Sequence, residues 1–181
     1  HNLGGGTAKT VFASIISRYQ DPDGDLGISD EGWEIAAKFL GNAHNIADGE
    51  DAVGSVIDGT YPMDEHWASG VLTEQKDRDY KFQIMTPDIG EPYVVESLAI
   101  SAGTKKYDTC VAFLNWLGSS DVQLDWSNNY GTIPCQKEAL DQVSDDIKEL
   151  METLKPQDLD WSFIAENVDA WVEKAELEYV Q

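Results

Sequence analysis

The feature that most constrains the fold is a small number of strands among many helices. Two segments have the apolar, β-branched composition of strands, "YKFQIMTP" at 80–87 and "YVVESLAIS" at 93–101. A third segment, "TYPMDEHWASGVL" at 60–72, predicts a strand followed by a turn. Since helices are predicted on both sides of these segments, we expect an α/β fold with an incomplete set of strands.

Apolar residues at helical spacing predict the helices. Three precede the strands, at about 7–19, 29–40 with a Ser29 cap, and 49–58 with Gly59 at its end. Further helices are predicted at about 105–117, 120–129, 144–154 and 162–180, with a turn at 136–140. The helix at 105–117 has a broad apolar face made of Tyr107, Cys110, Val111, Phe113, Leu114 and Leu117.

The charge excludes two classes of partner. The 181 residues include 34 acidic and 12 basic side chains, which gives a formal net charge of −22. Nucleic acids and anionic membrane surfaces require basic protein surfaces, so neither is expected as a partner. No run of about 18 apolar residues is present, so no membrane-spanning helix is predicted.

The two cysteines, Cys110 and Cys135, do not form a metal-binding pattern with the scattered histidines His1, His44 and His66. A disulfide between them would close a loop and stabilise the fold by roughly 3 kcal/mol. Two free thiols fit the sequence equally well. We therefore predict no metal site at these residues and leave the disulfide open.

An acidic loop, "DPDGDLGISDEG", imitates a calcium-binding loop. Asp21, Asp23 and Asp25 take the first three ligand positions, but Leu26 stands where glycine is needed and Gly32 where a bidentate glutamate is needed. A solvated loop before a helix is the better interpretation. Nucleophile motifs and Cys/His pairs typical of enzymes are also missing, so no catalytic residue, metal or cofactor is predicted.

The opening stretch "HNLGGGTAKTVFASII" predicts an anion-binding loop. Successive backbone N–H groups at the start of a helix converge on one point, where the helix dipole adds partial positive charge. Glycines allow a ligand to approach the backbone closely. Gly5, Gly6, Thr7 and Ala8 could therefore hold a phosphate, phosphonate or carboxylate. The alternative is a flexible entry to the helix with no ligand.

Several stretches in order resemble the extracytoplasmic solute-binding proteins of ABC importers, in the group that binds ferric ion, phosphonates and sugar phosphates. They are "GGGTAKTVFASIISRY", "EGWEIAAKFLGN", "VIDGTYPMDEHW", "GEPYVVESLAISAGTKKYDTCVAFLNWLGSSDVQ" and "LDWSFIAENVDAWVEKAELEY". The resemblance implies an α/β fold of the type II periplasmic-binding-protein kind, with two lobes joined by hinge strands. Residues 1–98 would form the second lobe, and 99–181 a mostly helical return segment that packs on the first lobe. A first-lobe segment would then precede His1.

The resemblance also implies a function. A small polar, anionic solute would bind in a cleft between the lobes and be delivered to an ABC permease. The location would be extracytoplasmic, either periplasmic or lipid-anchored at the cell surface, where a disulfide could form. In addition to the opening loop, the resemblance implies five ligand-binding residues: His66, Trp67, Tyr93, Glu96 and Ser97.

One part of the sequence departs from the resemblance. The strand after Gly59 is usually small and apolar in this group, whereas here it reads Met63, Asp64, Glu65, His66. Buried polar groups are costly without partners, so the segment either borders the cleft, lies out of register or forms an exposed edge. Two other functions remain open: the ligand-sensing module of a receptor or engineered fluorescent sensor, and an enzyme on a two-lobed fold.

Overall fold

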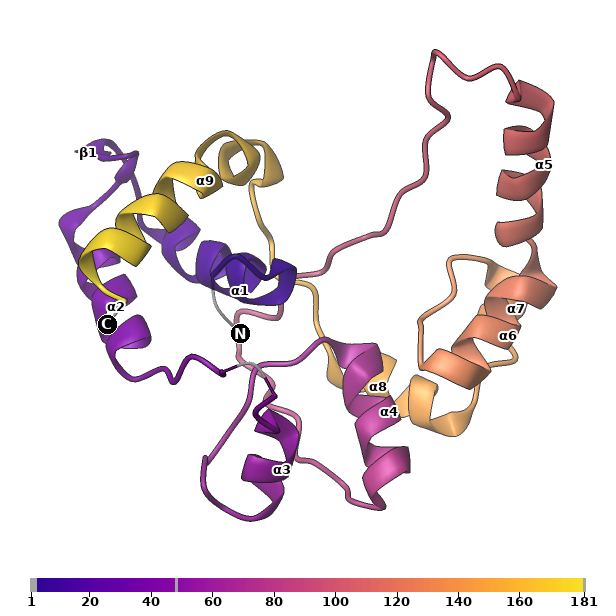
Figure 1. The fold of residues 1–181 in the computed structure, drawn as a ribbon, viewed down its shortest axis with the longest axis horizontal. Helices are drawn as coiled ribbons and strands as arrows, with labels where there is room; N and C mark the ends of the chain where they lie inside the picture. Colours follow the sequence, from indigo (N-terminus) through magenta and orange to yellow (C-terminus); the bar gives the residue numbers. More distant parts are fainter. Residues whose placement is uncertain (1–2, 48, 181) are drawn as a thin grey trace. The chain divides into compact units, whose positions relative to one another are not determined.

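The structure, a computed structural model, describes residues 3–47 and 49–180. His1 and Asn2 of the opening stretch lie outside these residues. The described elements follow the order α1 (Gly6–Ile16), η1 (Ser17–Tyr19), β1 (Gln20–Asp25), α2 (Asp30–Gly41), α3 (Ala52–Ile57), α4 (Ala68–Arg78), α5 (Tyr107–Leu117), α6 (Ser120–Tyr130), α7 (Lys137–Leu140), α8 (Asp145–Thr153) and α9 (Trp161–Glu178) (Figure 1). Two compact units divide the chain: unit 1 is 1–66 with 157–181, and unit 2 is 67–156.

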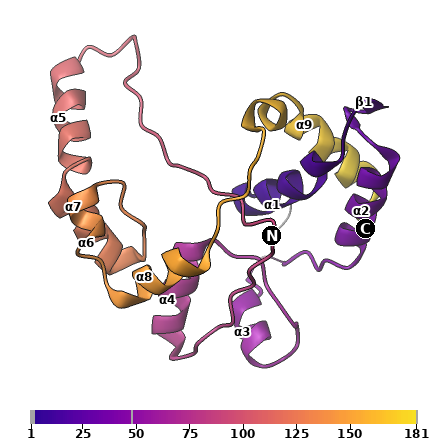
Figure 2. The same cartoon turned by 180° about the vertical axis from the view of Figure 1, so that it is seen from behind.

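Unit 1 is built from both ends of the chain. Helices α1, α2 and α9 lie together in both views (Figures 1 and 2), although α9 is more than a hundred residues from α1 in sequence. Their apolar faces form one buried cluster: Leu3, Phe12, Ala13, Ile16, Ile28, Trp33, Ala36, Ile164, Trp171, Val172 and Ala175. Burial of these side chains is the main source of stability for the unit.

Two tryptophans tie the β1 turn to this core. The indole Nε1–H of Trp171 donates to the carbonyl oxygen of Leu26 at 2.9 Å, and that of Trp33 donates to the carbonyl oxygen of Asp25 at 3.0 Å. Leu26 has a positive φ of 52°, an uncommon backbone conformation for a bulky residue. The hydrogen bonds to buried indoles therefore help to hold the acidic loop in a tight turn, which the sequence predicted only as a loop.

Unit 2 has a smaller core. Its described buried apolar side chains, Ala139, Val143, Ile147 and Leu150, lie in α7, in α8 and between them. Helix α6 contacts α4, α5 and α7. At the end of α6, Gly131 has a φ of +68°, and a Cβ there would lie 2.9 Å from the carbonyl oxygen of Ser69. A glycine is therefore required where α6 meets α4.

The helix predictions are largely confirmed. The side chain of Ser29 caps α2 by accepting a hydrogen bond from the N–H of Gly32, as its sequence position predicts. Helix α5 ends at the Gly118 cap, and α6, α8 and α9 lie within a few residues of their predicted ranges. The third helix, α3, is shorter than predicted because Asp51 caps it, accepting from the N–H of Gly54.

The strand predictions are wrong for this structure. Among the described residues β1 is the one named strand, and 80–87 and 93–101 are extended but unpaired. Strands depend on neighbouring strands for their backbone hydrogen bonds, which local composition cannot supply. In 60–72 the predicted strand and turn give way to an extended stretch followed by α4, whose Glu74 and Arg78 form an i,i+4 ion pair. The described residues are therefore mostly helical, with fewer strands than the sequence predicts.

Among residues 3–47 and 49–180, no helix combines the length and the apolar character needed to cross a bilayer.

Candidate functional site

The opening loop forms the start of α1. Gly5 occupies the N-cap position with extended backbone angles, and no side chain accepts a hydrogen bond at this helix start. The first turn contains no acidic residue. The first backbone N–H groups of a helix lack intrahelical acceptors, and among the described residues no backbone carbonyl accepts from those of Gly6, Thr7 and Ala8 at the positive end of the helix dipole.

The surroundings of this loop determine which atoms a ligand could reach. Gly6 is exposed, Thr7 is half-buried and Ala8 is buried. A Cβ added at Gly6 would meet nothing within 4 Å, so the space beside its backbone is open. The side chain of Ala8 belongs to the protein interior, and only its backbone N–H could take part in binding.

Lys9 is the basic residue nearest to the loop, but it already has a partner. Its Nζ lies 3.1 Å from Oδ1 of Asp169 on α9. This pair neutralises much of the local positive charge. An anion at the loop would therefore depend on backbone N–H groups and the Thr7 hydroxyl rather than on a lysine.

The polar segment before α4 is partly buried. Asp64, Glu65 and His66 are all half-buried, so this stretch is not the exposed edge that one sequence interpretation allowed. Nδ1 of His66 lies 3.3 Å from Oδ2 of Asp64. Oε1 of Glu65 is buried with no hydrogen-bond partner among the described residues, and burial raises the pKa of this carboxyl group. Sequence analysis did not select Glu65.

The other predicted ligand residues belong to unit 2. Trp67 precedes α4 as its N-cap residue and is 50% exposed. Tyr93 is half-buried, and burial, followed by the charge of Glu91, raises the pKa of its hydroxyl. Glu96 and Ser97 are exposed, and the hydroxyl of Ser97 donates to the carbonyl oxygen of Val95 at 3.4 Å. The structure places Glu96 and Ser97 side by side on the unpaired segment.

Within unit 1, Gly5, Gly6, Thr7 and Ala8 come together as one helix entry, whereas His66 pairs with Asp64 in another segment. The four residues of unit 2 occupy the N-terminal end of α4 and the extended segment that follows it.

Sequence reasoning missed a cluster around Glu50 in unit 1. The Glu50 carboxylate accepts from the N–H of Ala47 at 2.9 Å and the hydroxyl of Tyr61 at 3.3 Å, and it lies 2.9 Å from Nε2 of His44. These interactions, with the bond from Ala47 the largest cause, lower the pKa of Glu50. The rings of His44 and Tyr61 stack with centroids 4.9 Å apart.

A hollow of about 380 Å³ adjoins this cluster, and it is lined by Leu40, Gly41, Ala43, His44, Asn45, Tyr179 and Val180. Helical or strand periodicity could not reveal it, because its lining combines the end of α2, the loop that follows and the far end of the chain.

Across 3–47 and 49–180 no group of three or more His, Cys, Asp or Glu side chains is placed to hold a metal ion. Cys110 and Cys135 are both free, so the possible disulfide does not form in this structure. Cys110 is half-buried and Cys135 exposed.

The model of a family described as "Bacterial extracellular solute-binding protein" matches residues 6–155. A probable ABC transporter periplasmic-binding protein, y4fP of Sinorhizobium fredii (strain NBRC 101917 / NGR234), is 33% identical over 175 residues, which are 97% of this chain and 48% of that protein. The chain thus spans about half the length of this curated relative. No solved structure matches the chain described here.

Proposed function

Because this chain belongs to the bacterial extracellular solute-binding protein family, we propose that it is part of a non-enzymatic binding protein that captures a small anionic solute for an ABC permease. Family membership indicates a periplasmic-binding-protein fold and an extracytoplasmic location. The finer parts of the proposal are two lobes that close on the solute, a return segment at 99–181 that packs on the first lobe, and a periplasmic or lipid-anchored location.

The observation that best supports an anionic solute is the structure at the start of α1. Its first turn has backbone N–H donors, no side-chain cap and no acidic residue. At about 0.15 M salt the field of the −22 net charge is screened beyond roughly 8 Å, so local donors decide the outcome. Each hydrogen bond to a charged partner contributes roughly 1.5–3 kcal/mol, and two or three of them outweigh the screened repulsion.

Other residues are proposed to shape the site and restrict the solute. The ring of Trp67 and the half-buried ring of Tyr93 would supply apolar walls. Glu96 and Ser97, both exposed, would accept hydrogen bonds from hydroxyl or amine groups, and His66 would contribute a polar contact from beside Asp64. We include phosphonates, sugar phosphates and ferric complexes of small anions among the candidate solutes.

The first experiment identifies the solute class by thermal shift of the complete binding protein. The panel contains phosphonates, sugar phosphates, polyamines, amino acids and ferric ion. A true ligand at 100 times its dissociation constant stabilises the folded state by roughly 2.7 kcal/mol. Stabilisation by polyamines alone, with none by anions, would contradict the proposed solute class.

The second experiment tests the loop with Gly6→Val in the complete protein. Since the space beside Gly6 is open, the new side chain should leave the fold intact and block a ligand from the backbone. We expect affinity for the anion to fall at least tenfold, about 1.4 kcal/mol, in calorimetry. Gly41→Val is the matched control, because a Cβ there also meets nothing within 4 Å. Unchanged affinity in Gly6→Val would show that the loop is only a helix entry.

A further inference from the structure

The hollow beside the Glu50 cluster is formed by unit 1 alone, and it contains none of the residues proposed above to hold the solute. Its walls come from the last turn of α2, the loop that follows and the residues after α9: Leu40, Gly41, Ala43, His44, Asn45, Tyr179 and Val180. Its volume of about 380 Å³ lies within the range of small-molecule sites, about 300–1,000 Å³. The hollow is therefore large enough for a small organic ligand.

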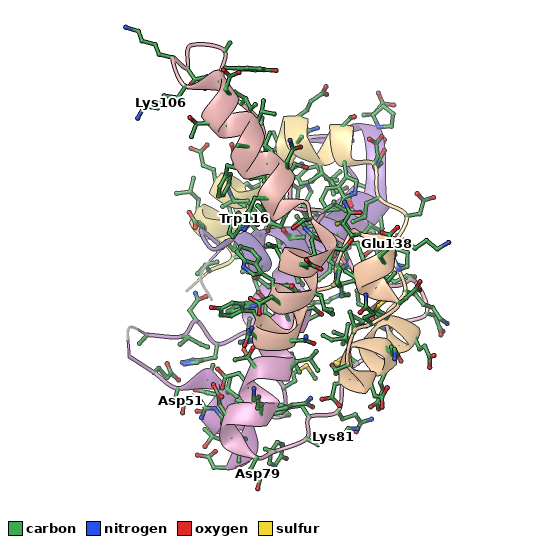
Figure 3. All side chains as sticks on the ribbon, turned by 90° about the vertical axis from the view of Figure 1, so that its right-hand side faces the viewer. Asp51, Asp79, Lys81, Lys106, Trp116 and Glu138 are labelled. Carbon is green, nitrogen blue, oxygen red and sulfur yellow. The ribbon has the colours of Figure 1, made fainter. Side chains whose placement is uncertain are left out.

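The loop on one side of the hollow is held at both ends. At its start, the side-chain amide of Asn42 donates to a carbonyl oxygen in the last turn of α2 at 2.7 Å. At its end, Asp51 caps α3, where Figure 3 labels it. Between them the ring of His44 stacks on that of Tyr61, and its Nε2 lies 2.9 Å from the carboxylate of Glu50. The His44 ring is thus a positioned part of the wall.

A second aromatic ring in the lining, that of Tyr179, is held as well. It is half-buried, its centroid lies 6.2 Å from that of the Trp33 ring, and the ammonium of Lys174 lies 5.9 Å from it. The carboxylate of Glu178 holds this ammonium at 2.7 Å. Since flat rings pack well against other flat rings, the two positioned rings of Tyr179 and His44 favour a flat ligand.

The described lining contains no lysine, arginine, aspartate or glutamate. Two carboxylates close to it in the sequence, Glu50 and Glu178, are already paired with His44 and Lys174. An ionic ligand would lose hydration without gaining a free opposite charge, which is costly. An anion would in addition meet the field of the −22 net charge. These observations favour an uncharged ligand.

Unused hydrogen-bonding groups of the lining indicate which edge the ligand presents. Asn45 is exposed, and its side-chain amide has no partner among the described residues. Within the same part of the chain, the backbone N–H groups of His44 and Asn45 make no backbone–backbone hydrogen bond. A side-chain amide offers a donor and an acceptor side by side, and this pair matches the neighbouring acceptor and donor groups at the edge of a nucleobase.

We propose that the hollow is a second binding site of this protein, and that its ligand is an uncharged planar heterocycle of the nucleobase or nucleoside class. The rings of His44 and Tyr179 contact the flat faces of the ligand, and Asn45 pairs with its hydrogen-bonding edge. Charge excludes the phosphorylated forms. The inference goes beyond the proposed function and shares no residue with the opening loop, so either can fail alone.

The deciding experiment is an NMR titration of the isotope-labelled 181-residue chain with adenosine. We expect saturable shifts at the side-chain amide of Asn45 and the ring of His44, with a Kd of roughly 1 mM or tighter. Thr7, in the opening loop, is the internal control and should not shift. Adenosine monophosphate, glucose and putrescine, titrated in the same way, should bind at least about tenfold more weakly, because each is charged or non-planar.

Four results would overturn the proposal. One is the absence of a saturable shift with both adenosine and adenine. Another is a set of shifts confined to Thr7, which would identify the opening loop as the site. Binding of adenosine monophosphate as tight as that of adenosine would contradict the uncharged class, and equally tight binding of glucose would contradict the planar one.

A pair of variants tests the hydrogen-bonding edge. Asn45→Ala removes an exposed amide from the lining, so it should leave the fold intact and weaken adenosine binding at least about tenfold. Asn42→Ala is the matched control, because it removes a neighbouring exposed amide that lies outside the lining. We expect its affinity to stay within about twofold of the unmodified chain. Equal affinities in the two variants would contradict the role of Asn45.

A second pair of variants tests the flat wall. Tyr179→Phe keeps the ring and should retain the adenosine affinity within about twofold, whereas Tyr179→Leu removes the ring and should lower it at least about tenfold. Urea unfolding checks that both variants fold, because Tyr179 is half-buried. If Tyr179→Leu does not fold, the variants at Asn45 and Asn42 decide the question. A folded Tyr179→Leu that binds adenosine as tightly as Tyr179→Phe would contradict the proposal.

Discussion

Unit 1 holds most of the large apolar side chains that are fully buried, whereas unit 2 holds most of those that are exposed. Of the six largest fully buried side chains among the described residues, Trp171, Phe12, Ile16 and Ile28 belong to unit 1. Twelve of the sixteen exposed large hydrophobic side chains described belong to unit 2. Both units contain amphipathic helices, so an apolar helix face becomes part of a core only where another apolar surface packs against it.

The largest expected effect compares one tryptophan from each unit. Trp171→Ala removes a fully buried ring and its hydrogen bond to Leu26, so it should lower the free energy of unfolding of the 181-residue chain by about 3–5 kcal/mol. Trp116→Ala removes a ring that is 53% exposed and should cost less than about 1 kcal/mol. Urea unfolding followed by circular dichroism measures both. Equal losses would show that the two units are packed alike.

A smaller effect compares two helix starts. The Asp160 carboxylate accepts hydrogen bonds from the N–H groups of Ser162 and Phe163 at the start of α9 in unit 1. Asp160→Ala should therefore destabilise the chain by about 1 kcal/mol. Ser144 stands at the same position of α8 in unit 2 but makes no side-chain cap, so Ser144→Ala should change the unfolding midpoint much less. A larger loss of stability in Ser144→Ala than in Asp160→Ala would contradict this comparison of the two helix starts.

The smallest expected effect is a pH dependence of the loop around Glu50. Hydrogen bonds from Ala47, His44 and Tyr61 lower the pKa of its carboxyl group in the folded state. Because the pKa is lowered in the folded state, the carboxylate stabilises the loop fully at pH values above the pKa of glutamate in the unfolded chain. This stabilisation is lost as the pH falls through the pKa of Glu50 in the folded state. Acid titration followed by the NMR signals of the His44 and Tyr61 rings should show the loop loosening.

Two variants sharpen this measurement. Glu50→Gln should remove the acid transition at these rings. Glu149→Gln, which removes an exposed ion pair with Lys81 in unit 2, should leave it unchanged. A transition that persists in Glu50→Gln would belong to another group.

Several features of the fold could be predicted from local chemistry. The Ser29 cap of α2 and the Gly118 end of α5 follow from residues whose effect acts within one helical turn. Helix α4 was mistaken for a strand and turn, because its support comes from polar pairs such as Glu74 and Arg78 rather than from an apolar stripe.

The candidate site was predictable only in part. The glycine-rich start of α1 is visible in the sequence, because a helix entry and its N–H donors are local features. The pairing of Lys9 with Asp169 and the cluster of Glu50 with His44 and Tyr61 are not visible. These partners are brought together by the path of the chain, which residue spacing does not encode.

The helices other than α4, the Ser29 cap of α2 and the net charge of −22 follow from the sequence, since each depends on neighbouring residues or on overall composition. The order of its motifs indicates the family. Only the tertiary structure decided that α9 completes the core of α1 and α2, that Trp171 holds the turn at Leu26, and that 93–100 remains unpaired. The physical reason is that burial and strand pairing require surfaces distant in sequence. A strand-forming segment pairs only where such a surface is supplied.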